Sequence, residues 1–149
     1  MIVLSHFQTK PLLHLKASLA TAAAEKRIKI SPDLGLTIVE ARLSKAEGLT
    51  FDSGPTLSWA AIEEISDAEN NCFLIEHGEL QKILAFSNLT NRVYTLMPTP
   101  CAPTMLVSGI PMHRIKGTDP YRDTLEKIRP LKPVVGQVLD TATGLGYTA

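Results

Sequence analysis

Apolar residues recur at helical intervals in two parts of the first half of the chain. The first part predicts a helix over residues 11–26, in which Pro11 suits the first turn and a run of alanines has high helix propensity. The second predicts a helix over residues 56–68, with Thr56 or Ser58 available as its N-cap.

The intervening and following segments show the shorter period of β-strands. In the clearest case Val39, Ala41 and Leu43 fall on one face of a strand, because successive side chains point to opposite sides. Three prolines within residues 98–103 are incompatible with a central strand and indicate a rigid connector. The predicted strands cover residues 28–30, 37–43, 49–51, 72–76, 83–86, 92–97 and 105–107.

Near the C-terminus a helix with well-marked ends precedes an apolar segment. Asp119 can cap this helix, Pro120 fits its first turn and Pro130 ends it. Residues 134–140 then form an apolar run typical of a strand buried on both faces. The elements together predict an α+β protein.

Composition narrows the class of protein. The chain has 149 residues, 44% of them hydrophobic and 20% charged, which predicts one folded domain, large enough to bury a core. Fifteen basic residues balance fifteen acidic ones, so nothing favours general binding to nucleic acid or to a membrane surface. No apolar run is long enough for a membrane helix, and no signal-peptide pattern is present, so we expect a cytoplasmic protein.

The cysteines and histidines give no metal-binding pattern. Cys72 and Cys101 lie far apart and lack the spacing of a zinc site or of a disulfide framework. The histidines also lack metal-ligand spacing, and we therefore expect no metal; they are His6, His14, His77 and His113.

The C-terminal segment carries the most specific chemical signal. An apolar strand that ends in Asp140 and continues to Gly144-x-Gly146 is how a doubly wound nucleotide-binding domain begins, because the glycines let the backbone approach a ligand closely. A simple glycine turn at the end of a strand is the alternative explanation of the same residues.

Residues 138–149, with the sequence VLDTATGLGYTA, resemble motif I of class I S-adenosylmethionine-dependent methyltransferases. The run from Pro98 to Leu125 is similar to a group of predicted methyltransferases, found mainly in archaea and cyanobacteria, that is related to spermidine-synthase-like proteins. The similarity is strong over residues 92–149 and looser over residues 28–91. In that group a small β-rich region precedes a Rossmann-like catalytic domain.

The resemblance implies a domain division and a cofactor loop. Residues 1–117 would form the β-rich N-terminal domain, and residues 118–149 would supply a helix, the first strand and motif I of an incomplete methyltransferase domain. The chain stops directly after the motif, so we expect it to be truncated. Where the family has a further glycine this chain has Ala142, which narrows the space for the methionine end of the cofactor. The cofactor-binding residues implied are Asp140, Thr141, Gly144 and Gly146.

A second set of candidates lies just before the C-terminal helix. The corresponding place in spermidine-synthase-like proteins roofs the cofactor cleft, so the polar side chains here are cleft or substrate candidates. Helix capping, packing and solvation explain the same residues without function. The candidates are His113, Arg114, Asp119 and Tyr121.

Three functions stay open at this point. The resemblance favours the N-terminal part of an S-adenosylmethionine-dependent methyltransferase, inactive as an isolated chain, with an acceptor substrate that the sequence does not reveal. An aminopropyltransferase related to polyamine synthases is the enzymatic alternative. A non-catalytic β module that forms a homodimer through exposed strands is the third, because uncovered apolar strands tend to pair with another chain.

Overall fold

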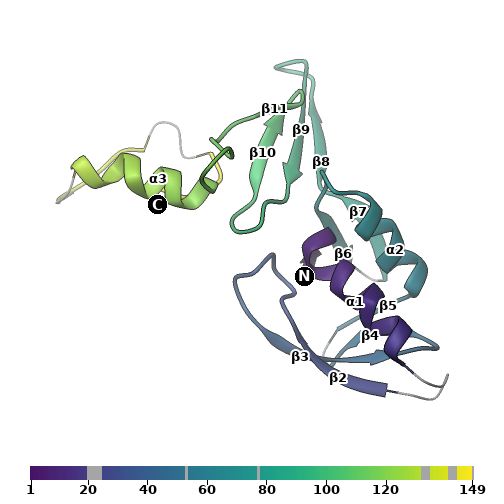
Figure 1. Cartoon of the computed structure of the whole chain (residues 1–149). Helices are drawn as coiled ribbons and strands as arrows, with labels where there is room; N and C mark the ends of the chain where they lie inside the picture. Colours follow the sequence, from purple (N-terminus) through teal and green to yellow (C-terminus); the bar gives the residue numbers. More distant parts are fainter. Residues whose placement is uncertain (20–24, 53, 77, 132–134, 141–143, 149) are drawn as a thin grey trace. The chain divides into compact units, whose positions relative to one another are not determined.

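The computed structural model describes residues 1–19, 25–52, 54–76, 78–131, 135–140 and 144–148. These residues form an α+β fold with three antiparallel sheets and three α-helices, divided into two compact units, Met1–Leu84 and Ala85–Ala149 (Figure 1). The boundary drawn from the resemblance, between residues 117 and 118, lies inside the second unit. In the described part of the chain no helix is long and apolar enough to cross a membrane.

The first unit contains two of the sheets and two helices. The strands of one sheet follow the order β2-β3-β4-β5 and those of the other the order β1-β6-β7, with antiparallel pairing in both. The elements are β1 (Ile2–Leu4), α1 (His6–Ser18), β2 (Glu25–Ile30), β3 (Val39–Ser44), β4 (Gly48–Phe51), β5 (Thr56–Leu57), α2 (Trp59–Asp67), β6 (Phe73–Glu76) and β7 (Glu79–Lys82).

Helix α1 differs from the helix predicted over residues 11–26. It begins at His6 because Ser5 caps it, and the Gln8 side chain accepts a hydrogen bond of 3.0 Å from the Ser5 amide to complete a capping box. Pro11 therefore lies inside the helix instead of at its start. The alanine run at residues 20–24 lies outside the described residues.

The core of the first unit confirms the pattern predicted for residues 37–43. Ala41 and Leu43 are buried while Glu40 and Arg42 are exposed. Helix α2 is capped by Ser58, one of the two predicted caps, and packs against α1. Large apolar side chains from the helices and sheets fill the interior; the fully buried ones include Leu4, Leu43, Leu49, Ile62, Ile65 and Phe73.

The second unit contains the third sheet and the C-terminal helix. The sheet has the order β11-β10-β9-β8, and the strand predicted over residues 92–97 is confirmed. The strand predicted over residues 83–86 is confirmed as β8, which begins at Leu84, whereas the preceding β7, which belongs to another sheet, was not predicted. The elements are β8 (Leu84–Ser87), β9 (Arg92–Met97), β10 (Thr104–Val107), β11 (Ile110–Pro111), α3 (Pro120–Ile128) and a 3-10 turn (Arg129–Leu131).

The predicted strand over residues 134–140 is wrong. Residues 135–140 have no strand pairing in the structure and all are exposed, while Val134 lies outside the described residues. A strand exists only through its hydrogen-bonded neighbours, and no described strand pairs with this segment. The described part of the run, residues 135–140, therefore lies at the surface, and it does not show the first strand of a Rossmann-like domain.

Candidate functional site

Strands β10 and β11 bring His113 against Thr104. The Thr104 side chain is fully buried, and its Oγ1 lies 3.0 Å from His113 Nδ1 and accepts a hydrogen bond of 3.4 Å from the His113 amide. Burial lowers the pKa of His113 below its ordinary value; the charge of Lys127 adds to this effect and the charge of Asp123 opposes it. The imidazole is therefore anchored at one nitrogen and favoured in its neutral form.

Helix α3 supplies the opposite wall. Asp119 caps the helix by accepting a hydrogen bond of 3.1 Å from the Arg122 amide, as the sequence predicts. One turn further on, the buried carboxylate of Asp123 accepts a hydrogen bond of 2.5 Å from Lys127 Nζ, and the lysine side chain itself remains largely exposed. The helix thus directs a partly neutralised ammonium group towards the region of His113.

The glycine loop closes the site from the C-terminal side. Gly144 has φ 57° and Gly146 has φ 80°, values that glycine adopts without strain. Between His113 and Tyr121 lies the ring of Tyr147, with ring centroids 5.4 Å and 6.0 Å away, and its hydroxyl donates a hydrogen bond of 2.7 Å to the Pro103 carbonyl. The aromatic contacts hold this loop against the sheet and α3.

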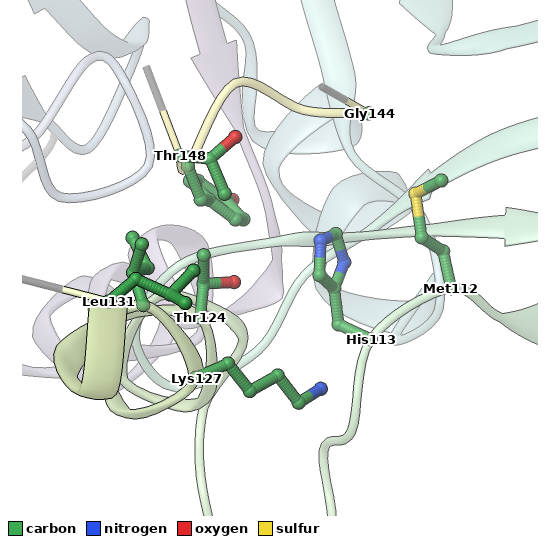
Figure 2. Close-up of a pocket in the computed structure, with 9 residues that line it drawn as sticks. Met112, His113, Thr124, Lys127, Leu131, Gly144 and Thr148 are labelled. Atoms are coloured by element: carbon green, nitrogen blue, oxygen red, sulfur yellow. The ribbon is translucent and has the colours of Figure 1, made fainter. Parts of the chain in front are cut away.

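The segment around His113, helix α3 and the glycine loop line a cavity of about 390 Å³ that is open to solvent (Figure 2). Its size falls at the small end of the range for pockets that hold small molecules. The figure shows Thr124 and Leu131 on the side of α3, His113 and Met112 on the other side, and the Lys127 side chain extending from α3 towards the side of His113. The lining residues are Met112, His113, Thr124, Lys127, Ile128, Leu131, Gly144, Tyr147 and Thr148.

The candidates implied by the methyltransferase resemblance are only partly brought together. Gly144 lines the cavity, and Gly146 lies two residues further along the same loop. Asp140 is exposed and accepts a hydrogen bond from the Thr148 hydroxyl, which links the two ends of the loop segment. Thr141 lies outside the described residues.

Of the four candidates that precede the C-terminal helix in the sequence or lie at its start, only some reach the cavity. His113 lines the cavity, and Tyr121 contributes indirectly through its edge-on contact with Tyr147. Arg114 is exposed and does not line the cavity, and Asp119 is occupied by the helix N-terminus. In the described ranges no group of His, Cys, Asp and Glu side chains is placed to hold a metal ion.

The structure adds three residues that sequence reasoning did not single out. Thr104 orients His113, Lys127 lines the cavity, and Tyr147 holds the glycine loop. The i,i+4 spacing of Asp123 and Lys127 was a visible signal of their ion pair. The other two contacts are non-local and leave no local pattern in the sequence.

Comparison with known proteins identifies a relative that is much longer than this chain. The chain is 45% identical over 94 residues to uncharacterized protein MJ1233 of Methanocaldococcus jannaschii. The match covers 62% of this chain but only 31% of the archaeal protein, so the chain spans less than a third of that relative's length. No protein-family model matches the chain.

Proposed function

We propose that this chain is the N-terminal part of an S-adenosylmethionine-dependent methyltransferase and that residues 140–148 contribute to its cofactor site. The observation that carries the proposal is the glycine loop, in which Gly144 combines a positive φ with a place on the cavity wall. The resemblance of residues 138–149 to motif I supports the activity, and the match to less than a third of a longer archaeal protein supports the view that the chain is part of a larger protein. The proposal includes a cytoplasmic location, where both cysteines stay as free thiols.

The residues of this chain would contribute positioning. Gly144 and Gly146 would allow the backbone to come close to the ligand, and the ring contacts of Tyr147 would hold residues 144–148 next to His113 and Tyr121. Bound S-adenosylmethionine would supply an electrophilic methyl group, and such transfers depend chiefly on the alignment of donor and acceptor.

Binding of S-adenosylmethionine tests the proposal. We expect isothermal titration to show no low-micromolar binding to the 149-residue chain, because a Cβ at Gly146 would meet nothing within 4 Å and the loop is open on that side. A chain that continues through the codons following residue 149 should bind S-adenosylmethionine. A stop codon there without a frameshifted catalytic domain, or an extended chain that does not bind, would contradict the proposal.

A matched pair of glycine variants isolates the loop. Gly144→Ala in the extended chain should weaken binding, because it adds a methyl group to a residue that lines the cavity and has a backbone φ of 57°. Gly109→Ala is the control, since Gly109 also has a positive φ, 85°, but a Cβ there meets open space and the residue does not line the cavity. Equal binding by the two variants would remove the glycine loop from the cofactor site.

A further inference from the structure

The buried hydroxyl of Thr104 determines which nitrogen of His113 carries the proton. Thr104 Oγ1 accepts the His113 amide hydrogen, so its own proton needs an acceptor within the interior. His113 Nδ1, at 3.0 Å, is the acceptor that the described structure offers. Nδ1 therefore accepts the Thr104 proton, and the neutral imidazole bears its hydrogen on Nε2.

The polar groups of the cavity consequently present protons to a ligand. The Thr124 hydroxyl donates to the Pro120 carbonyl at 2.8 Å, and the Thr148 hydroxyl donates to Asp140. Lys127 gives one of its three ammonium protons to Asp123 and keeps two. Among the described side chains that line the cavity, the donors left for a ligand are thus the Nε2–H of His113 and the ammonium group of Lys127.

The rest of the lining is apolar. Met112, Ile128 and Leu131 contribute aliphatic side chains, and the ring of Tyr147 forms a further part of the wall. A charged group in the part of a ligand that contacts these side chains would lose its hydration without gaining a partner. A hydrocarbon chain would instead gain about 25 cal/mol for each Å² removed from water.

We propose that this cavity binds a carboxylate attached to an apolar chain, with His113 Nε2–H and Lys127 Nζ as the donors to its oxygens. Burial of the imidazole favours the neutral ring, which makes His113 a hydrogen-bond donor to the ligand and not a base. A carboxylate next to an ammonium group forms a charge-assisted hydrogen bond, the stronger class of such contacts. The cavity is the one that Gly144 lines in the proposed cofactor site, but the inference rests on the contacts of His113 and Lys127, and its test on the present chain needs neither S-adenosylmethionine nor methyl transfer.

Nuclear magnetic resonance on the 149-residue chain tests both parts of the proposal. The imidazole ¹⁵N shifts of His113 should show an unprotonated Nδ1 and a protonated Nε2, and Thr104→Val should abolish this preference while Thr104→Ser keeps it. Butyrate should shift the His113 ring signals saturably, whereas butylammonium, of similar length and opposite charge, should not. A protonated Nδ1 in the neutral ring, no saturable shift with butyrate, or equal shifts with both probes would overturn the proposal.

Side-chain variants locate the two donors. His113→Leu and Lys127→Met should each weaken butyrate binding at least about tenfold, the effect of one lost hydrogen bond to a charged group. His113→Gln places an amide donor close to the position of Nε2–H and should bind within about threefold of the unaltered chain. Amide spectra that match the unaltered chain identify the variants that are folded. If His113→Gln binds as weakly as His113→Leu, His113 does not act as a donor to the ligand.

Discussion

Two features restrict position 48 to glycine: its backbone conformation and the close approach of a neighbouring strand. Its φ is 100°, and a Cβ built on it would lie 2.1 Å from the Leu57 carbonyl oxygen in the neighbouring strand. Gly48→Ala should therefore lower the free energy of unfolding by more than about 2 kcal/mol. Gly35→Ala is the matched control, because Gly35 has φ 103° but nothing within 4 Å of the added methyl group. If urea unfolding shows the same loss of unfolding free energy for both variants, the short distance to the Leu57 carbonyl does not determine the effect at Gly48.

The two cysteines should differ sharply in reactivity. Burial raises the pKa of the Cys72 thiol to about 12, whereas Cys101 is exposed. Because the thiolate is the reactive form, one thiol per chain should react with a disulfide reagent at pH 8 in the folded state, and two in urea. Cys101→Ser should remove the fast reaction. Persistence of that reaction in the variant would show that Cys72 is accessible.

The environment of His113 predicts a pH dependence of stability. Burial first, then the Lys127 charge, holds its folded-state pKa below the value of about 6.5 for the unfolded chain. Since the unfolded state binds the proton more readily, the stability that His113 contributes is present above about pH 6.5 and is lost as the pH falls through the folded pKa. The free energy of unfolding should decrease between pH 8 and pH 5.5. His113→Gln should flatten this decrease; an unchanged slope would assign it to other groups, among them His6, whose pKa burial also lowers.

At the scale of elements, helix α3 depends on its N-terminal cap. Asp119→Ala should reduce stability by roughly 1 kcal/mol, because the Arg122 amide loses its acceptor. Asp119→Asn keeps an acceptor oxygen and should recover most of the loss. The urea midpoint measures both variants, and a midpoint unchanged by Asp119→Ala would mean that the cap does not stabilise the helix.

The elements that the sequence predicts correctly are those with local signals. Asp119, Pro120 and Pro130 mark α3 within a few residues of its ends, and the alternation around Ala41 marks β3. The start of α1 was also encoded locally, in the Ser5–Gln8 capping box, but Pro11 and the alanine run suggested a later start. The capping box, and not Pro11, determines where this helix begins.

The remaining differences come from non-local contacts. Strand β7 has the polar sequence ELQK, which by itself predicts no strand, and it exists through its pairing with β6. Residues 135–140 have the composition of a buried strand, but burial needs neighbouring strands that the sequence pattern cannot guarantee. His113 could be predicted as a candidate, whereas its contact with Tyr147 joins residues 34 positions apart in the chain.

For the whole molecule, the exposed apolar segment before the glycine loop predicts self-association. Val135 is 80% exposed, Val138 65% and Leu139 85%, and the segment has no strand partner in the described structure. Covering such surface yields about 25 cal/mol per Å², and unpaired backbone groups are available for a second copy. Sedimentation velocity over a range of concentrations should show dimers or larger species of the 149-residue chain.

Lysine substitutions at two nearby positions test whether the apolar segment itself drives the self-association or whether any added charge weakens it. Leu139→Lys should weaken the self-association, because it removes exposed apolar surface and adds a charge that would have to be desolvated. Gln137→Lys adds the same charge at another exposed position but removes no apolar side chain, so it should change the association less. A chain that sediments as a monomer at all concentrations would contradict the prediction. Equal effects of the two variants would show that net charge, and not the apolar segment, controls the association.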